Sequence, residues 1–163
     1  MKKVKYLIAA GMVFILTGFS VVLGNTPQPS KGEAVSVINR SAAIIRTAQR
    51  FAVEGQKYNG LGLSLGHQLY ARQLYGQGDY TNAGFHSLRA RELAARVIAL
   101  NKSSLINEAL YNRNEERLVR SSPSGQELDR KLRGARFTVP DDQEAAHADV
   151  DLEVYSEWEG KRS

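Results

Sequence analysis

The sequence predicts an all-α protein: an N-terminal transmembrane or signal helix, then a three- to four-helix antiparallel bundle, and finally a poorly ordered acidic C-terminal tail. Three observations support this architecture. An uncharged apolar stretch lies close to the N-terminus, apolar residues recur every three or four positions through the centre of the chain, and eight of the last 23 residues are acidic. Together they indicate a helical domain that its N-terminal segment carries out of the cytoplasm.

The N-terminal segment has the charge pattern of an export signal. Residues 6–23 contain no charged side chain, and Lys2, Lys3 and Lys5 precede them. No further basic residue follows before Lys31. Because basic residues resist translocation, this pattern places the N-terminus in the cytoplasm and the rest of the chain in the periplasm or outside the cell.

The length of this segment falls between that of a membrane-spanning helix and that of a cleaved signal peptide. A spanning helix needs about 20 apolar residues, whereas the apolar region of a cleaved signal has about 7–15. The stretch 6–23 therefore fits an uncleaved single-pass membrane anchor, which we favour, and also a signal peptide cleaved after Gly24, which would leave the protein secreted. We assign residues 1–24 to this signal-anchor or signal peptide and residues 25–30 to a linker.

The chain has no cysteine, which excludes disulfide bonds, thiolate metal sites, cysteine nucleophiles and a thioether-linked lipid. An exported domain without disulfides has to be stabilised by its own packed core. Apolar residues make up 38 of the 78 residues from Ala34 to Tyr111, but only 15 of the 52 that follow. We therefore predict a helical bundle over 31–111 and, over 112–163, an extension without an independent core.

A capping box marks the start of the first helix. Ser30 stands three residues before Glu33, so that each side chain can accept from the other's backbone N–H. An apolar stripe typical of one helix face follows, through Val35, Ile38, Ala42, Ile45, Gln49 and Ala52. We expect this helix to end near Tyr58, because Asn59-Gly60 suits a left-handed C-cap.

Two further helices are predicted within the bundle. A helical pattern runs from about residue 63 to residue 75, and a glycine-rich turn follows at 76–78. Asp79 is a suitable N-cap for a third helix over 80–101. The pattern pauses at 101–104 and resumes through residue 110, so one long bent helix and two separate helices both stay open.

The extension carries two short signals. Ser124 and Glu127 form a second capping box, which predicts a short helix over 125–133. Val150, Leu152 and Val154 alternate with acidic residues, a pattern that forms a strand only if a partner supplies the other edge. On its own we expect the acidic tail to be poorly ordered, because its like charges oppose compaction.

Residues around the second turn have the spacing of a tetratricopeptide repeat: Ala71, Leu74, Gly78, Asp79, Tyr80, Ala83 and Ala90. The stretch resembles a single repeat of that family, and it is also similar to the helical hairpins with a Gly-Asp-Tyr turn of uncharacterised bacterial envelope proteins. Ser87 departs from the family pattern, which has a bulky aromatic residue there, and no second copy follows at the 34-residue period. The resemblance implies one hairpin that contacts other proteins and carries no catalytic residues.

The net charge of +5 hides an asymmetry between body and tail. Residues 1–140 carry 20 basic and 9 acidic side chains, whereas residues 141–163 carry 8 acidic and 2 basic ones. Three interpretations stay open: the tail folds back on the basic body, tail and body face different partners, or the tail only keeps the protein soluble. Because an exported protein rarely meets nucleic acid, anionic lipid and cell-wall polymer are the polyanionic partners to consider.

We find no pattern typical of a catalytic, cofactor-binding or metal-binding site. His67, His86 and His147 lack the i,i+4 pairing or neighbouring glutamate of a metal motif, and the acidic residues of the body are too widely spread for a two-carboxylate site. Gly60 and Gly62 lie among helices rather than after a strand, which disfavours a nucleotide-binding loop. We therefore expect neither an enzyme nor a bound cofactor.

The candidates for partner binding are aromatic and large apolar side chains in two places. They are the hairpin residues Tyr70, Tyr75 and Tyr80 and the tail residues Leu152, Val154, Tyr155 and Trp158. Tyrosines also close helical turns with the ring buried and the hydroxyl wet, whereas a solubilising tail has no need of such groups. We favour a membrane-tethered, exported adaptor or scaffold that binds another envelope protein. The alternatives are an exported cell-wall enzyme or inhibitor with a dispersed site and a polyanion or anionic-lipid binder that uses the basic helical face.

Overall fold

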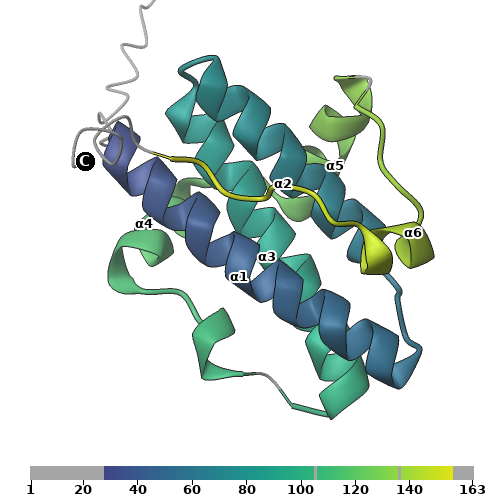
Figure 1. The fold of residues 1–163 in the computed structure, drawn as a ribbon. Helices are drawn as coiled ribbons and strands as arrows, with labels where there is room; N and C mark the ends of the chain where they lie inside the picture. The colour runs from purple at the N-terminus through teal and green to yellow at the C-terminus, as the bar shows by residue number, and fades with distance from the viewer. Residues whose placement is uncertain (1–27, 105, 136, 156–163) are drawn as a thin grey trace, which may run out of the picture.

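The computed structural model describes residues 28–104, 106–135 and 137–155 of the chain. Every regular element in these ranges is a helix, and no strand occurs in them, which confirms the predicted all-α class. Figure 1 shows three long helices side by side, with shorter helices and an extended C-terminal segment packed around them. The elements are α1 (Lys31–Gly55), α2 (Leu61–Gly76), α3 (Tyr80–Lys102), the 3₁₀ turn η1 (Asn107–Ala109), α4 (Arg113–Ser121), α5 (Gly125–Gly134) and α6 (Asp142–His147).

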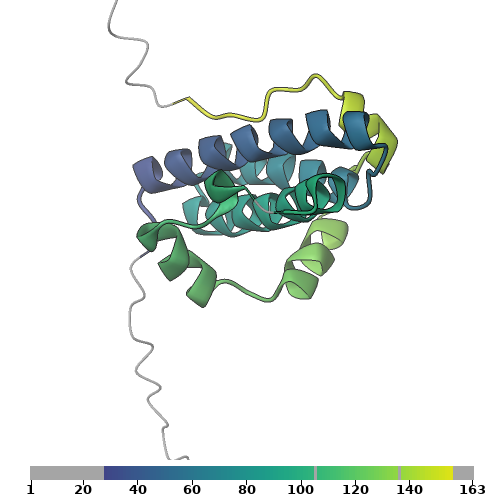
Figure 2. The same ribbon diagram turned by 90° about the horizontal axis from the view of Figure 1, so that it is seen from below.

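The three long helices form the bundle. Short turns join α1 to α2 and α2 to α3, so consecutive helices run antiparallel, and α3 packs against both of the others. In Figure 2 the extended C-terminal segment lies over α1 and α2, whereas α4 and α5 lie on the opposite side, against α3. The residues after the bundle therefore cover it on two sides.

The predicted N-caps of the helices are confirmed. Ser30 accepts from the backbone N–H of Glu33, and the Glu33 carboxylate accepts from the Ser30 N–H, which completes the capping box of α1. Asp79 caps α3 by accepting from the N–H of Asn82 at 3.1 Å. Ser124 caps α5 by accepting from the Glu127 N–H, but the return bond to the Glu127 carboxylate that a full capping box requires is not formed. These local hydrogen bonds fix three of the helix starts.

The first helix ends earlier than predicted. It stops at Gly55, and Gln56 follows in the left-handed conformation at φ 56°, rather than near Tyr58. Gly60 does adopt a left-handed φ of 92°, but as the N-cap of α2. The glycine that we expected to end one helix therefore begins the next.

The question left open at the end of the third helix is answered. α3 ends at Lys102, and Ser103 closes it in the left-handed conformation, with its N–H bonded to the Ala99 carbonyl. Only the 3₁₀ turn η1 follows before α4. The chain after α3 is therefore a separate segment and not a bent continuation of that helix.

Two short helices, α4 and α6, were missed in the extension. Each begins with a capping box of the kind that we used for α1: Asn112 with Glu115 in α4, and Asp141 with Glu144 in α6. The sequence therefore contained the signal. We overlooked it because the two segments are short and poor in apolar residues.

The packed core is shared between the bundle and the extension. The larger apolar cluster joins bundle residues such as Ile45 and Ile98 to Ala145 and Leu152, and Leu132 of α5 is fully buried. The extension has too few apolar residues for a core of its own, as expected, but those it has complete the core of the bundle. The packed body is therefore not confined to the predicted range 31–111.

The prediction of a poorly ordered tail is wrong for residues 141–155. Leu152 and Val154 are 1% and 7% exposed, against α1 and α2. The repulsion among tail carboxylates is offset because arginines of the helices pair with two of them. The remaining tail residues, 156–163, lie outside the described residues.

No helix in the described ranges is long and apolar enough to cross a membrane. The predicted signal-anchor or signal peptide, residues 1–24, lies outside those ranges. The proposed membrane attachment therefore stays a prediction from the sequence.

We predict that Gly62→Ala destabilises the protein by about 1–3 kcal/mol, the usual cost of overpacking. An added Cβ at Gly62 would lie 2.2 Å from the Pro140 carbonyl oxygen and 3.0 Å from the Asp141 carbonyl carbon. Gly76, also helical, has nothing within 4 Å of the added atom. Gly76→Ala should therefore be neutral or stabilising, because alanine favours a helix by about 1 kcal/mol over glycine. Urea unfolding of both variants checks this, and equal stabilities would mean that the chain before α6 does not pack on α2.

Candidate functional site

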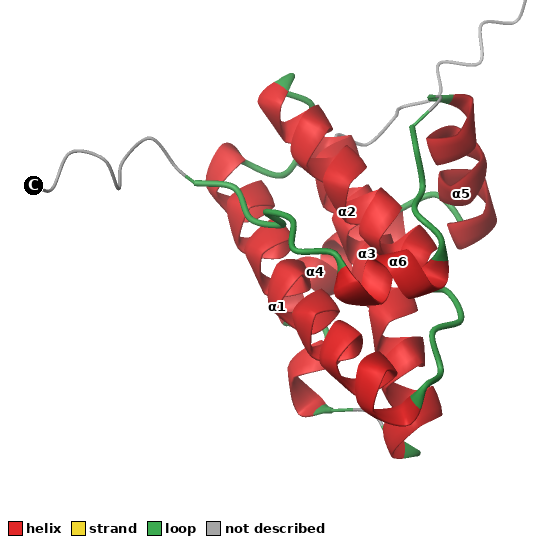
Figure 3. Cartoon of the chain, turned by 45° about the vertical axis from the view of Figure 1, so that its right-hand side comes forward, coloured by secondary structure: helices red, strands yellow, loops and turns green. Residues whose placement is uncertain are grey.

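The extended segment 149–155, which we call the tail segment, runs along α1 and α2 (Figures 1 and 3). It contacts Asn39 of α1 and Gln68 of α2, and we call the surface of the two helices that it covers the α1–α2 groove. The tail segment runs antiparallel to α1. The carbonyl of Ala148, just before it, accepts from Gln49 late in α1, whereas Val154 bonds to Asn39 early in α1. The tail segment thus follows the α1–α2 groove towards the start of the bundle.

Two side-chain amides hold the backbone of the tail segment. Asn39 donates to the Val154 carbonyl at 3.0 Å and accepts from the Val154 N–H at 2.9 Å. Gln68, fully buried, donates to the carbonyls of Leu152 and Ile38 at 2.7 and 2.9 Å. Because a primary amide both donates and accepts, these side chains take the place of a neighbouring strand edge. They recognise peptide backbone rather than particular side chains.

Alternate side chains of the tail segment enter the helical core, as expected for an extended chain. Leu152 joins the apolar cluster shared by the three long helices. Val154 joins a second cluster with Ile38, Leu74 and Ala83. The groove therefore has two apolar sockets, two residues apart along the bound segment.

The intervening acidic residues pair with arginines on the rims of the groove. Asp151 lies 2.8 Å from Arg72 of α2, and Glu153 pairs with Arg46 of α1. All four side chains are partly exposed. Of the three interpretations of the tail's charge, the structure shows the first for these residues: the tail folds back on the basic body.

Hydrogen bonds hold α6, which immediately precedes the tail segment, against α1 and the start of α2. Asp142 accepts from the backbone N–H groups of Gly60 and Gly62 at 3.0 and 2.8 Å, a favourable place for a carboxylate because the N–H groups of a helix start carry partial positive charge. Gln49 donates to the carbonyls of Ala145 and Ala148. The position of α6 is therefore fixed independently of the tail segment.

The three candidate tyrosines lie around one apolar cluster. Tyr70 and Tyr75 are half-buried and pack against the cluster that contains Val154, and the ring of Tyr80 lies 5.4 Å from that of Tyr75. The ring of Tyr70 also lies 4.8 Å from His86 and 5.7 Å from Phe137. The structure therefore places two of the three candidates against the cluster that Val154 joins, and Tyr70 also packs on side chains outside the tail segment.

The tail candidates divide between buried and exposed positions. Leu152 and Val154 are buried in the body, so in this conformation they are closed to a partner. Tyr155 is 64% exposed and stays available. Trp158 lies outside the described residues.

Sequence reasoning missed the two amides that bind the tail segment. Asn39 and Gln68 lie beside apolar helix positions, and only their contacts in three dimensions give them a role. Gln49 differs from them, because it stands within the apolar stripe itself. A long amide in such a stripe is a signal that buried carbonyls will need a donor.

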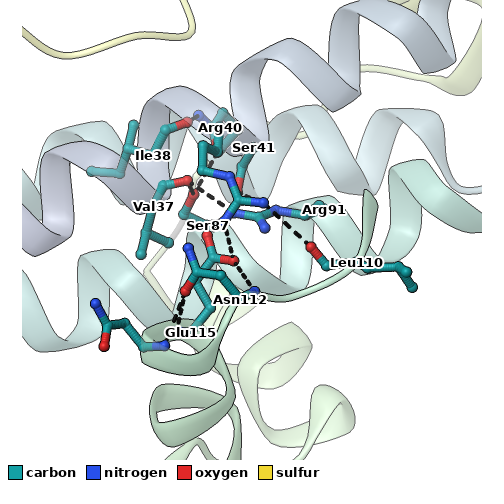
Figure 4. Close-up of polar contacts among 11 residues, drawn as sticks. Val37, Ile38, Arg40, Ser41, Ser87, Arg91, Leu110, Asn112 and Glu115 are labelled. Atoms are coloured by element: carbon teal, nitrogen blue, oxygen red, sulfur yellow. Dashed lines mark hydrogen bonds and ion pairs between the residues drawn. The ribbon is translucent and has the colours of Figure 1, made fainter. Parts of the chain in front are cut away.

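On the other side of the bundle, Arg91 of α3 is fully buried (Figure 4). Its guanidinium donates to the Ser41 hydroxyl at 3.1 Å, to the Val37 carbonyl at 3.3 Å and to Glu115 at 2.7 Å. Its Cζ also lies 5.6 Å from the centre of the Tyr111 ring. This charge therefore joins α1, α3 and α4 at one point.

Glu115, 1% exposed, is the carboxylate that neutralises this site. It accepts from Arg91, from Arg40 at 2.5 Å and from the backbone N–H of Asn112 at 2.9 Å. Burial opposes its ionisation, but the hydrogen bonds from Arg91 and Asn112 and the charges of the two arginines outweigh burial and lower its pKa. The capping-box glutamate of α4 is thus an ionised group of the core.

A second buried polar network joins α2, α3 and α5. The Nδ1 atoms of His67 and His86 lie 2.8 Å apart, and His67 Nε2 lies 2.9 Å from Asp129 of α5. Arg89 makes a bidentate pair with the same aspartate. Because an ionised carboxylate only accepts, His67 donates from Nε2 and, when neutral, accepts at Nδ1 from His86. The network therefore fixes one tautomer of each ring.

Burial lowers the pKa of both histidines. For His86 the pKa falls to about 3, through desolvation first and the neighbouring His67 second. Desolvation also lowers the pKa of His67, although Asp129 partly opposes this. Both rings are at most 1% exposed. They are consequently neutral at physiological pH and closed to a substrate, so we assign them a structural role.

Most arginines of the three long helices are paired with acids. Those that contact a carboxylate are Arg40, Arg46, Arg72, Arg89, Arg91 and Arg96. Pairing reduces the positive field that these residues can offer a polyanion. Within the described ranges, no group of three or more histidine, aspartate or glutamate side chains is placed to hold a metal ion.

A cavity of about 750 Å³ lies between the start of α1 and α4. Pro29 and Val37 line it from one side and Leu118 from the other, and the Glu33–Arg117 ion pair at 3.4 Å lies within its lining. Its size is within the range of small-molecule sites. The lining is mainly apolar surface with the charges of Glu33, Arg117 and Arg120 among it, and it indicates no particular ligand.

No known family, curated protein or solved structure matches this chain. The likeness of α2 and α3 to a tetratricopeptide hairpin is therefore neither supported nor contradicted.

We predict that Glu115→Gln costs about 3–5 kcal/mol of stability, because it leaves the charge of Arg91 buried without its principal carboxylate. Adding Arg91→Met should restore part of the loss, since the uncompensated guanidinium is then gone. Glu116→Gln in the same helix removes an exposed pair with Arg120 and should cost less than about 1 kcal/mol. Urea unfolding measures all three variants. A double variant less stable than Glu115→Gln alone would refute the buried-charge explanation.

We also predict that the protein loses stability as the pH falls below about 6.5. The unfolded pKa of histidine is about 6.5, and the folded values for His67 and His86 are lower. Between pH 6.5 and about 3 the unfolded chain therefore binds more protons, and the free energy of unfolding decreases on acidification. At pH 5 each histidine should account for a loss of at most about 2 kcal/mol.

Two variants identify the groups responsible. His86→Phe keeps a ring beside Tyr70 but cannot titrate, so the variant should be less stable overall and less sensitive to pH between 7.5 and 5. His147→Gln replaces an exposed histidine and should leave the profile unchanged. Asp129, whose pKa is lowered, adds a loss only below its ordinary pKa of 3.8. Unfolding free energies that are equal at pH 7.5 and pH 5 would contradict the prediction.

Proposed function

We propose that the chain is a membrane-tethered, exported helical adaptor that binds another envelope protein. One observation carries the proposal: the α1–α2 groove holds an extended peptide through Asn39 and Gln68, which contact its backbone. Backbone hydrogen bonds combined with pockets for alternate side chains are a recurring way to bind peptides. A groove that accepts one extended segment in this way has the chemistry to accept another.

The tether comes from the sequence. The apolar stretch ends at residue 23, and the body begins with the Pro29-Ser30 pair. Five residues of chain span at most about 18 Å, so an uncleaved anchor would keep the groove close to the membrane surface. A partner in or on the same membrane is then within reach.

The two alternatives draw less support from the described residues. An anionic-lipid or polymer binder would use the basic face, but six of its arginines already contact carboxylates. An exported enzyme or inhibitor would need an accessible reacting group, and the His67–His86 pair is buried. We therefore retain the adaptor as the proposal.

Site-specific photo-crosslinking in intact membranes tests this function. A photoreactive amino acid at Val35 of α1, half-buried beside the cluster that contains Val154, stays at the groove whether or not the tail segment is bound, and should give one discrete adduct with an envelope protein. The same group at Val53, which is exposed on α1 at the opposite end of the helix, should give none. Adducts with lipid alone at Val35 would favour the lipid-binding alternative and contradict the adaptor.

A further inference from the structure

We infer that the α1–α2 groove is the binding site for an extended segment of another envelope protein in which acidic and apolar residues alternate, and that the tail segment occupies this site as an internal competitor. The inference rests on the adaptor function proposed above. It adds the chemistry of the partner segment and the means by which its binding is regulated.

The groove contains the side-chain amides needed to bind the backbone of an extended segment. Asn39 exchanges two hydrogen bonds with Val154, and Gln68 holds the carbonyl of Leu152, two residues earlier. Residues i and i+2 face the same side of an extended chain. The two amides therefore hold one face of a segment whatever its side chains are.

Side-chain selection comes from the sockets and the rims. Leu152 and Val154 fill the two sockets and are almost fully buried. The residues before each of them, Asp151 and Glu153, meet arginines on opposite rims. A competing segment with the order acidic, apolar, acidic, apolar would satisfy all four positions.

The tail segment can leave the groove without leaving buried polar groups unpaired. Gln68 retains its bond to the Ile38 carbonyl and accepts from the Ser87 hydroxyl at 3.1 Å. Asn39 is only half-buried and can be hydrated once Val154 leaves. Arg46 and Arg72 lie on the rims, where water reaches them. Departure therefore exposes Leu152, Val154 and the core residues that they cover, but it leaves no charge buried without a partner.

The part of the chain that can detach from the groove has a defined start. α6 is held by Asp142 and Gln49 independently of the tail segment. Asp149 and Val150, which follow α6, are exposed. The part that can detach therefore begins after Ala148, and the rest of the body stays in place.

The start after Ala148 disfavours a second copy of the chain as the occupant. Two residues span at most about 7 Å. The tail segment of one copy could reach the groove of another only if the two bundles packed together at α6. A separate protein has no such restriction, because its extended segment need not be attached to a fixed helix.

The internal competitor sets a threshold for binding. A segment attached by a short linker has an effective concentration in the millimolar range. A free segment must displace it. The apparent affinity of that segment for the intact chain is therefore its affinity for an open groove multiplied by the fraction of molecules in which the groove is open. Only a partner that is tightly bound, or concentrated at the same membrane, occupies the groove.

Peptide binding to the full chain in detergent tests the inference. The probe is a fluorescent synthetic peptide with the sequence of residues 149–155. The tail-released variant carries Leu152→Asp and Val154→Asp in the full chain, which removes the competitor without truncation. Fluorescence anisotropy should show that this variant binds the probe at least tenfold more tightly than the parent. A control peptide with the same two substitutions should not bind.

A charge swap locates the binding to the groove. In the tail-released variant, Arg72→Glu should weaken binding of the probe at least tenfold, and a probe with Asp151→Arg should recover most of the loss. Arg120→Glu on α4, with a side chain that is 81% exposed and far along the chain from the groove, is the matched control and should change nothing. Equal effects of the two reversals would overturn the inference.

Three other results would also overturn it. Loss of the helical circular dichroism signal in the tail-released variant would mean that the tail segment is an inseparable part of the fold. A folded tail-released variant that fails to bind the probe would mean that the groove is no peptide site. A parent that is dimeric, and monomeric only when the tail is released, would make a second copy the occupant.

Failure of this inference and failure of the adaptor function are distinguishable. The peptide assay needs no envelope partner, so it can succeed even if photo-crosslinking at Val35 yields no protein adduct. Conversely, an adduct that is equally strong when Arg72→Glu is added to the tail-released variant would support an adaptor that binds its partner elsewhere, and would exclude the groove.

Discussion

The arrangement of this chain depends on neutralising one buried charge. A guanidinium removed from water is strongly destabilising unless a carboxylate and further hydrogen-bond acceptors surround it, and Arg91 meets all of these within the core. Its carboxylate, Glu115, comes from α4, a helix with few apolar residues that would otherwise have little reason to dock. Because Val37 and Ser41 of α1 accept from the same guanidinium, the requirement also fixes how α1 lies on α3.

The two sides of the bundle are held by different kinds of interaction, and this difference governs what can move. On the side of α4 and α5 the contacts are ionic and largely buried, as in the Arg91–Glu115 and Arg89–Asp129 pairs. Breaking one of these leaves a charge in the core. On the side of the tail segment the contacts are neutral amides and rim arginines, which water can satisfy. The ionic side is therefore fixed, and the amide side can exchange its ligand.

The bundle could be predicted from the sequence because its signals are local. The caps at Ser30 and Asp79 and the apolar stripes lie within single helices, so no knowledge of distant contacts is needed. The same cap pattern at Asn112 and Asp141 would have revealed α4 and α6.

The docked tail could not be predicted in this way. The alternation of Leu152 with its acidic neighbours gives the extended conformation, but the surface that buries it belongs to helices about 80 to 115 residues earlier. The candidate site depends on that distant pairing. The sequence therefore did not indicate the roles of Asn39 and Gln68, and it indicated Tyr155 only as one aromatic residue among several.

The antiparallel course of the tail segment along α1 brings both ends of the described chain to one pole of the molecule, since Val154 packs beside Val35 in the first turns of α1. The other pole consists of the loop between α1 and α2 and the last turn of α3, which Lys57 and Asn101 join by hydrogen bonds. A tag inserted in that loop would therefore lie at the pole opposite to residues 28 and 155 of the described chain.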